Sequence, residues 1–359
     1  MNPTRLTELL GLVHPIVQGP FGGGLSSVAL AAAVSNGGGL GSFGAHNVPP
    51  AQMRTLVDDL RKETGRPFAV NLWVPQAAEA DVPREGPALV PHIERLRPYY
   101  DEAGAAPPAT PLTYPDFGEQ VDAAIAARPP VLSFVMGIPP ADVLRRAAEA
   151  GIRTIATATT VDEAVAIEAA GLDAVVASGS DAGGHRGACL RPVEESLVGT
   201  FALIPQVADA VAIPVIAAGG IADGRGVAAA LTLGASGVQI GTGFLATAES
   251  NASAPHRAAL ASPGARVTVL TRLFSGRHGR SIANGFTREM ASAEAEVPAY
   301  PLQNALMLPI RRAAAAAGNP DRLNLWSGQA AALTRPRAAA EYLETLVREA
   351  GEALAGRHG

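Results

Sequence analysis

Eight short apolar segments recur along this chain, and an alanine-rich amphipathic stretch follows most of them. Short apolar runs of this kind are typical of strands that are buried on both faces of a parallel sheet. Right-handed strand–helix–strand crossovers leave few arrangements for eight such units, and a closed barrel is the common one. The sequence therefore predicts an α/β fold, a (β/α)8 TIM barrel. The predicted strands are Pro15–Gln18, Gly39–Phe43, Phe68–Leu72, Val131–Val135, Arg153–Thr157, Asp173–Ser178, Pro214–Ala218 and Gly237–Gly241.

The stretches between these strands carry signals for helix starts. Thr160 is followed three residues later by Glu163, which fits a capping box. Pro139 and Pro140 stand where a first helical turn tolerates proline. The predicted helices are Leu25–Asn36, Pro50–Glu63, Asp116–Arg128, Ala141–Ala150, Val161–Ala170, Glu195–Ala210 and Gly226–Leu233.

Two segments do not fit the minimal strand–helix unit. Pro75–Pro115 is rich in Pro, Ala and Gly and predicts a long loop after the third strand, with one short helical piece. Residues 248–335 leave the barrel pattern, and Pro336–Leu354 then returns to a helical spacing of apolar residues. We expect residues 1–247 and 336–359 to form the barrel, with 248–335 as a mainly helical insertion between strand eight and helix eight. Such connections emerge at the face of a barrel where active sites lie, so the insertion is a candidate lid over a substrate.

Composition narrows the functional classes. The formal net charge of −5 gives no electrostatic case for nucleic acid, which needs a clustered basic face, and no apolar run approaches the length of a membrane span. The N-terminus lacks the basic start and apolar core of a signal peptide. The one cysteine, Cys189, excludes an intramolecular disulfide and a cysteine-rich zinc site. We expect a soluble cytoplasmic protein without metal, nucleic-acid or membrane partners, for which a homodimer is the candidate assembly.

Two glycine clusters follow the last two predicted strands. Glycine lets the backbone approach a ligand closely, and the loops after strands seven and eight of a barrel commonly form a phosphate pocket. Ordinary strand-to-helix turns would explain either cluster alone, but two clusters on adjacent strands favour a phosphate site. The candidate residues are Gly219 and Gly220 after the seventh strand, and Gln239, Ile240, Gly241 and Thr242 at the end of the eighth.

The first two strands are also glycine-rich at their ends. Gln18, Gly19 and Pro20 follow the first strand, and a flat aromatic cofactor needs bare backbone of this kind on one face. Tight turns and close helix packing are the alternative explanation. The spacing and the acidic residue of a dinucleotide fingerprint are missing, so NAD binding is not predicted. Asn71, at the end of the third strand, either donates and accepts in the site or serves as a turn or cap residue.

His185 stands between Gly184 and Arg186 in the loop after the sixth strand. Histidine changes charge near physiological pH, so it can act as a base toward a carbon acid or donate to a developing negative charge. Asp181 and Arg186 are candidates to tune or orient it. The alternative is a loop histidine bonded to a carbonyl, but flanking glycines at the active end of a barrel favour a functional role. Nothing near Cys189 suggests an activated thiolate, and we expect most of four other histidines, His46, His92, His256 and His278, at the surface.

These segments together resemble the nitronate monooxygenase family, formerly called the 2-nitropropane dioxygenases. The resemblance covers about Pro15 to Thr247 and resumes at Leu325–Gln329, which is similar to a Leu-Trp-Ala-Gly-Gln motif of that family. The segment Asp181–Gly187 is specific to this group and its close relatives, whereas the two phosphate-site clusters occur more widely in FMN barrels. The resemblance implies that FMN is the cofactor and that His185 is catalytic. It also implies FMN contacts at Asn71, Gly183, Gly220 and the run from Gln239 to Thr242.

The chain departs from the family pattern at three places. Ser178 stands where a Gln is usual, Asp181 where a Glu is usual, and the run from Gln18 reads Gln-Gly-Pro-Phe where Gln-Ala-Pro-Met is common. Ser178 removes an amide that would contact the flavin in relatives. Flavin affinity survives such a change more easily than substrate identity does.

The resemblance implies FMN-dependent oxidation of alkyl nitronates, or of related nitro compounds, with O2 as the second substrate. The flavin transfers the electrons, while the protein positions the substrate and tunes charge. His185 would act as a base or as a donor that stabilises the anion. Two alternatives remain open. One is an NAD(P)H-dependent flavin reductase of quinones or enoyl thioesters, and the other is a non-catalytic barrel that binds a phosphate ligand.

Overall fold

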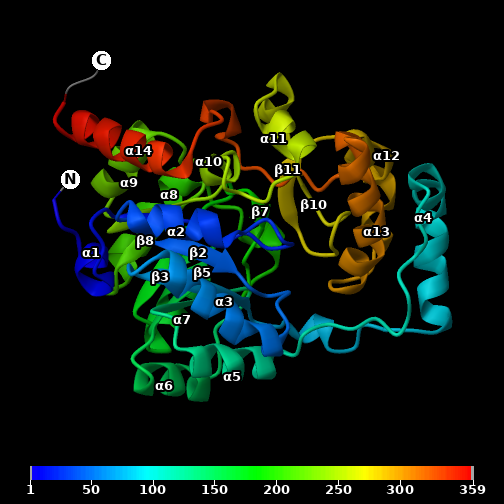
Figure 1. Ribbon diagram of the computed structural model, residues 1–359, viewed down its shortest axis with the longest axis horizontal. Coiled ribbons are helices and arrows are strands. Elements are labelled where there is room, and N and C mark those ends of the chain that lie inside the picture. Colours follow the sequence, from blue (N-terminus) through cyan, green and yellow to red (C-terminus); the bar gives the residue numbers. More distant parts are fainter. Residues whose placement is uncertain (1, 357–359) are drawn as a thin grey trace.

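Eight parallel strands form a ring in this computed structural model, which describes residues 2–356; they lie in the blue-to-green part of Figure 1. They follow the order β1-β9-β8-β6-β5-β4-β3-β2. Leu40 closes the ring between β2 and β1, because its N–H donates to Ile16 O and its carbonyl accepts from Gln18 N, both at 2.9 Å. The predicted (β/α)8 barrel is confirmed. The strands are β1 (Ile16–Gln18), β2 (Gly41–Gly44), β3 (Phe68–Trp73), β4 (Val131–Val135), β5 (Arg153–Ala158), β6 (Ala174–Ser178), β8 (Val215–Ala218) and β9 (Gly237–Ile240).

The amino-terminal end of the barrel is filled by side chains. Helix α1 (Arg5–Leu10) places Leu6 and Leu10 against strand residues such as Val17 and Ile155, and all four side chains are buried. The interior of a barrel of this size is a packed core rather than a pore. The space for a ligand therefore lies at the opposite rim, where the carboxyl ends of all the parallel strands meet.

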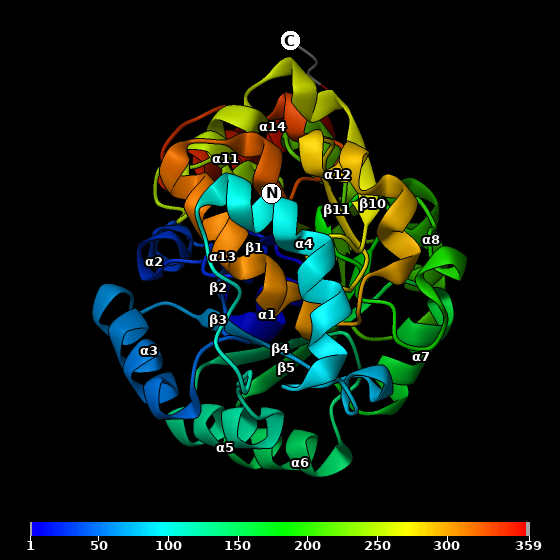
Figure 2. The ribbon, with the colours of Figure 1, turned by 90° about the vertical axis from the view of Figure 1, so that its right-hand side faces the viewer.

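Helices alternate with the strands and cover the outside of the ring (Figure 2). The C-terminal helix α14 packs on α9 and α2, with Leu343 and Leu346 in one buried cluster with Val227 and Leu30, which makes it the eighth barrel helix as predicted. No helix within residues 2–356 is long and apolar enough to cross a membrane. The surrounding helices are α2 (Val28–Asn36), α3 (Pro50–Glu63), α5 (Phe117–Ala127), α6 (Ala141–Glu149), α7 (Val161–Ala169), α8 (Thr200–Ala210), α9 (Gly224–Thr232) and α14 (Ala339–Leu354).

The long loop after β3 and residues 248–335 together form a lobe at one end of the molecule (Figure 1). Helix α4 from the loop packs on α13 from the insertion, and Tyr100 OH donates to Leu306 O at 2.6 Å. Phe274 and Phe286 lie in the same buried cluster, so the lobe has a hydrophobic core of its own. We name these two segments the lobe. Its helices are α4 (Val90–Ala103), α11 (Ala254–Leu260), α12 (Gly285–Glu289) and α13 (Leu302–Ala317), while the short α10 (Thr242–Leu245) follows β9 directly.

The lobe also contains a β-hairpin that the sequence analysis did not anticipate. Strands β10 (Thr268–Thr271) and β11 (Gly279–Ile282) pair antiparallel, and β11 pairs in turn with β7 (Gly184–His185). These strands carry Thr, Gly, Arg and Ser rather than a continuous apolar run, so their sequence does not resemble the buried barrel strands. The hairpin joins the loop that carries His185 to the lobe.

Among the helices that begin later than predicted, α8 and α2 have side-chain acceptors at their starts. Helix α8 starts at Thr200 rather than Glu195, because Val193–Glu195 forms a separate 3-10 turn and the Asp181 carboxylate accepts from the N–H of Thr200 at 2.6 Å. Helix α2 starts at Val28, because the Ser27 hydroxyl caps it by accepting from Leu30 N at 2.9 Å. Side-chain acceptors thus set both starts.

The predicted capping box at Thr160 is only half formed. The Thr160 hydroxyl accepts from Glu163 N at 3.3 Å, as expected. The buried Glu163 carboxylate does not return to Thr160 and instead accepts from Thr159 N and from Cys189 N, each at 2.6 Å. Glu163 therefore ties helix α7 to the loop that follows His185.

Gly41 in β2 lies so close to α2 that a Cβ atom there would be 1.9 Å from Ala31 O. We expect Gly41→Ala to lower the free energy of unfolding by about 1–3 kcal/mol, because the added methyl group forces a backbone shift in a packed layer. Gly65→Ala is the matched control, since a Cβ there meets nothing within 4 Å. Urea unfolding followed by circular dichroism measures both variants. Equal stability of the two would contradict the close packing of β2 on α2.

Candidate active site

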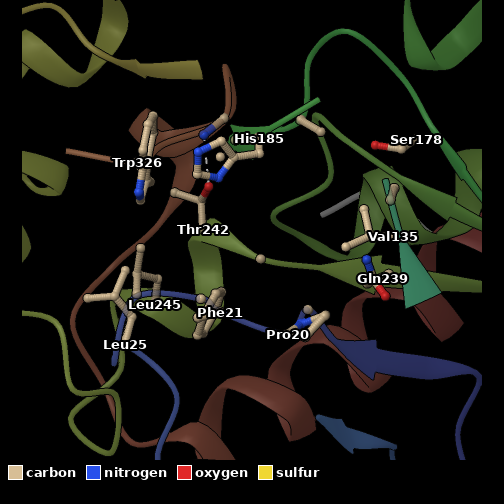
Figure 3. Close-up of a pocket in the computed structure, with 18 of the residues that line it drawn as sticks. Pro20, Phe21, Leu25, Val135, Ser178, His185, Gln239, Thr242, Leu245 and Trp326 are labelled. Carbon is tan, nitrogen blue, oxygen red and sulfur yellow. Dashed lines mark hydrogen bonds between the residues drawn. The ribbon is translucent and has the colours of Figure 1, made fainter. Parts of the chain in front are cut away.

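A cavity lies at the carboxyl ends of the barrel strands, and the lobe contributes to its walls (Figure 3). Most of the predicted site residues line it. Gln18 and Ile240 do not, because both are buried in the wall, where Gln18 Oε1 accepts from Ser42 N at 2.9 Å. The predicted residues that line the cavity are Gly19, Pro20, Asn71, Ser178, Gly183, His185, Gly219, Gly220, Gln239, Gly241 and Thr242.

The glycines after β8 have a backbone conformation that favours an anion site. Gly219 and Gly220 have φ angles of +108° and +67°, a region that other residues rarely adopt. A Cβ on Gly219 would also lie 2.6 Å from Thr200 Oγ1. Among residues 2–356, the N–H groups of Gly220 and Ile221 donate to no protein acceptor. Together with the unpaired first N–H groups of α10, they offer donors to an anion such as a phosphate.

The hydrogen bonds of His185 assign its neutral tautomer. Its Nε2 lies 2.7 Å from the hydroxyl of Ser275. The hydroxyl oxygen also lies 3.1 Å from Arg277 O and accepts from Arg277 N at 3.3 Å; with its single hydrogen assigned to the carbonyl, it accepts from His185, and Nε2 carries the proton. A neutral imidazole has one N–H, and Nδ1 is therefore an acceptor without a protein donor in the described part of the chain.

His185 is held in its neutral form. Burial lowers the pKa of the imidazole well below its usual value, and the positive charges of Arg277 and Arg311 and the ring of His46 lower it further. Removing a cation from water and placing it near other cations both disfavour the charged form. At neutral pH the Nδ1 atom is thus free to accept a proton.

Asp181 and Arg186 do not orient His185, and the prediction that they could is wrong. The Asp181 carboxylate accepts from Thr200 N at the start of α8. The buried Arg186 guanidinium donates to carbonyl oxygens, among them Gly179 O at 2.6 Å. Both side chains shape the loop after β6, and the orientation of the imidazole comes from the lobe through Ser275.

Aromatic side chains that were not predicted from the sequence surround His185. Its ring centroid lies 4.7 Å from that of Trp326, beside it in Figure 3, and 5.0 Å from that of Trp73. His46 stacks on Trp73 with centroids 3.8 Å apart and planes within 6°. The signals available in the sequence were the Leu325–Gln329 motif, which contains Trp326, and the strand ends, because Trp73 is the last residue of β3 and His46 follows β2.

The expectation that most of the other histidines lie at the surface is wrong for two of them. His46 and His256 are buried, and burial lowers their pKa values to about 3 and about 4. His46 faces the cavity from the loop after β2, and His256 lies within the lobe, on α11, with Nε2 3.0 Å from Trp326 O. His92 and His278 are partly buried. Sequence patterns did not show that the lobe would cover these positions.

A buried ion pair joins the two segments of the lobe next to the cavity. Glu79 comes from the loop after β3 and pairs with Arg277, which precedes β11. The Arg277 guanidinium also lies 5.3 Å from the ring centroid of Trp73 and 4.7 Å from that of Tyr300. The positive charge of Arg277 is therefore compensated by a carboxylate and by two aromatic faces.

The remaining titratable groups give no sign of metal or thiolate chemistry. Within residues 2–356, no group of three or more His, Cys, Asp or Glu side chains is placed to hold a metal ion. Burial, with the nearby Glu163 carboxylate, raises the pKa of the Cys189 thiol to about 12. A thiol that stays protonated is a poor nucleophile, which supports a structural role for Cys189.

Comparison with known proteins places the chain in a family. Residues 3–349 match the family model described as nitronate monooxygenase. A probable nitronate monooxygenase from Staphylococcus aureus (strain MSSA476) is 40% identical over 356 residues, which are 98% of this chain and 99% of that protein. The chain belongs to the nitronate monooxygenase family. The resemblance inferred from its motifs is confirmed.

Solved structures agree with this assignment. A nitroalkane oxidase from Streptomyces ansochromogenes has a TM-score of 0.89 and 40% identity, covering 99% of this chain and 100% of that one. FabK from Thermotoga maritima has a TM-score of 0.78 and 31% identity, covering 99% and 98%. The enoyl reductase domain of MlnA from Bacillus amyloliquefaciens shares the fold at a TM-score of 0.68 and 16% identity, covering 98% and 97%.

This member of the nitronate monooxygenase family is therefore a flavin-dependent oxidoreductase, and its relatives support the oxidation of nitro compounds. The assignment to the flavin-dependent oxidoreductases argues against the alternative of a non-catalytic phosphate-binding barrel.

The assigned tautomer of His185 is directly testable by nitrogen NMR of histidine-labelled protein. We expect wild type at pH 7 to show His185 with a protonated Nε2 and an unprotonated Nδ1. In Ser275→Ala the fixed acceptor is lost, and the signal moves toward the average of the two tautomers. His256, whose Nε2 must donate to a carbonyl, is the internal reference and stays unchanged. An unchanged His185 in the variant would show that Ser275 does not set the tautomer.

Proposed function

We propose that the cavity of this enzyme holds FMN. The donors at Gly220, Ile221 and the start of α10 fit its phosphate, because they are unpaired in residues 2–356 and face the cavity. Gly183 lines the cavity, and its close packing on the backbone of Gly328, where a Cβ would lie 2.4 Å from Gly328 N, requires glycine at this position. When bound, FMN would supply the electron transfer of the reaction. The other residues that would hold it are Gly19, Pro20, Asn71, Ser178, Gly219, Gln239, Gly241 and Thr242.

Asn71 is suited to form a hydrogen bond with a polar edge of the flavin ring. Its Nδ2 donates to Ser133 O at 3.1 Å and to Ser133 Oγ at 3.0 Å. The amide is therefore fixed, and its Oδ1 accepts from no protein donor in the described residues. Ser178 lines the same cavity with a short hydroxyl, in place of the longer amide that is usual in the family (Figure 3).

The reaction is the oxidation of alkyl nitronates, or of related nitro compounds, with O2 as the second substrate. His185 accepts the proton from the carbon next to the nitro group when the substrate arrives as a neutral nitroalkane. The neutral ring of His185, with its unpaired Nδ1 at the cavity surface and its Nε2 fixed by Ser275, is the observation that carries this role.

The insertion serves as the cover over the substrate. Tyr300, Asn304 and Trp326 all come from residues 248–335 and line the cavity together with the barrel residues. Their contribution supports the division into a barrel of residues 1–247 and 336–359 and an inserted substrate segment. Aromatic rings at this position exclude water from the reacting atoms.

The second candidate function is the reduction of quinones or enoyl thioesters by NAD(P)H with the same flavin. The 31% identity to FabK over nearly the whole chain is the observation that keeps this candidate. The likeness to the enoyl reductase domain, at 16% identity, concerns the fold alone. The identity to a nitroalkane oxidase is higher, at 40%, and favours nitronate oxidation.

Replacement of Gly219 tests the phosphate site. We expect Gly219→Ala to lose most of its bound FMN during gel filtration, because the added methyl group strains a positive φ next to the proposed phosphate donors. Gly234→Ala is the matched control: its φ of +101° is nearly the same, but it lies in the turn after α9, outside the cavity. Absorbance at 280 nm and in the flavin band gives the flavin-to-protein ratio. Equal loss in both variants would assign the effect to backbone strain.

His185→Asn separates proton removal from the later oxidation. We expect oxygen uptake with neutral nitroethane to fall by about 10²–10⁴-fold, the usual contribution of a positioned base. Uptake with preformed ethyl nitronate should fall much less, because that substrate has already lost the proton. An oxygen electrode measures both, and equal losses would contradict the base role.

The pH dependence of the wild-type enzyme follows from the same imidazole. His185 accepts a proton only when neutral, so activity is lost as the pH falls through its pKa. Because that pKa is lowered, kcat/KM for nitroethane should stay constant as the pH is lowered past the usual histidine pKa of about 6.5. It should fall only at a more acidic pH. A titration midpoint at or above that value would contradict the buried, neutral ring.

A further inference from the structure

Arg311 of α13 reaches the cavity from the lobe and is surrounded by neutral acceptors. Its Nη2 donates to Asn304 O at 3.0 Å and to Asn304 Oδ1 at 2.8 Å. With the Asn324 amide oxygen turned toward its donors, that oxygen accepts from Arg311 Nη1 at 3.2 Å and from Trp326 Nε1 at 2.6 Å. Arg311, Asn304 and Asn324 all line the cavity. We name these three residues the lobe cluster.

The positive charge of Arg311 has no carboxylate partner among residues 2–356. Other enclosed arginines of the lobe are paired: Arg277 with Glu79, and Arg322 with Glu102 and Glu289. Burial lowers the pKa of Arg311 to about 10, with the adjacent Arg312 as a further cause, and its buried Nε makes no hydrogen bond. A buried cation without a counter-ion is costly, and a bound anion removes that cost.

The lobe cluster lies next to the proposed base. Trp326 contacts the ring of His185 at a centroid distance of 4.7 Å and, through Nε1, shares the Asn324 oxygen with Arg311. Arg311 is also among the charges that act on His185. An anion that forms beside His185 therefore forms within the field of the Arg311 guanidinium.

We propose that Arg311 is the binding residue for the nitro oxygens of the nitronate anion, with Asn304 and Asn324 holding its guanidinium in place. The inference rests on the proposed function. The proton leaves carbon for His185 Nδ1, the C–H electron pair stays with the substrate, and the resulting charge develops on the two nitro oxygens. Asn304 takes both Nη2 hydrogens and Asn324 takes one on Nη1, so the second Nη1 hydrogen and the positive charge are what the guanidinium offers to a nitro oxygen. Arg311 thus favours the anionic substrate over the neutral one.

Nitrate is the probe for this subsite, because it is a planar oxyanion whose binding can be measured without turnover. The experiment compares holoenzymes of wild type, Arg311→Gln and Arg311→Lys, with Arg312→Gln as the control. Arg312 is the exposed neighbour on the same helix and does not line the cavity. Nitrate binding is measured by thermal shift and by perturbation of the flavin spectrum, and steady-state kinetics are measured with ethyl nitronate.

We expect nitrate to stabilise wild type and Arg312→Gln, to stabilise Arg311→Lys less, and to leave Arg311→Gln unaffected. KM for the nitronate should rise by about 10- to 100-fold in Arg311→Gln, as expected for a lost hydrogen bond to a charged group. The melting temperature of Arg311→Gln without nitrate should not fall, since an unpaired buried charge is removed. A structural role for Arg311 would instead lower that temperature and leave the nitrate response intact.

The two proposals fail in distinguishable ways. Nitrate binding that depends on Arg311 in an enzyme without nitronate turnover would preserve the anion subsite and remove the proposed reaction. Nitronate turnover with nitrate binding equal in wild type and Arg311→Gln, or with no nitrate binding in wild type, would overturn the assignment of Arg311.

Discussion

The pairing of β7 with β11 is the contact on which the geometry of the site depends. It places His185 opposite Gly279, at the boundary between barrel and lobe. Ser275, on the same lobe segment, then fixes which imidazole nitrogen carries the proton. Gly279 leaves room for Trp326, because a Cβ there would lie 2.7 Å from the indole ring. The barrel supplies the histidine, and the lobe determines how it is presented to the cavity.

Charge is distributed unevenly around that histidine. Arg277 is neutralised by Glu79 and lies between two aromatic rings, so it holds the lobe together without leaving an open charge. Arg311 has neutral partners in the lobe cluster and keeps its charge toward the cavity. Both cations keep the imidazole neutral, and the unpaired one is available for an anion. The base and the anion subsite are therefore complementary, because His185 accepts the proton and Arg311 stabilises the nitronate anion that forms.

The sequence predicted those parts of the protein that follow from local pattern. Buried apolar strands and the glycines at 219 and 220 are visible because burial and positive φ restrict the residue type directly. The hairpin was missed because β10 and β11 lack an apolar run, and their pairing depends on a lobe core assembled from two distant segments. The start of α8 was misplaced because it depends on Asp181, nineteen positions earlier in the chain. The role of Arg311 could not be predicted from the sequence either, because its lack of a carboxylate partner is a property of the folded chain.

The most direct test of the account uses the purified holoenzyme, whose flavin absorbance reports its own reduction. NADH or NADPH is added without oxygen, and ethyl nitronate is then added to a separate sample with oxygen while oxygen uptake is followed. The account predicts that the flavin stays oxidised with either pyridine nucleotide and that oxygen falls with the nitronate. Rapid bleaching by NADH or NADPH, with no oxygen uptake in the presence of nitronate, would contradict it and assign the enzyme to the reductases.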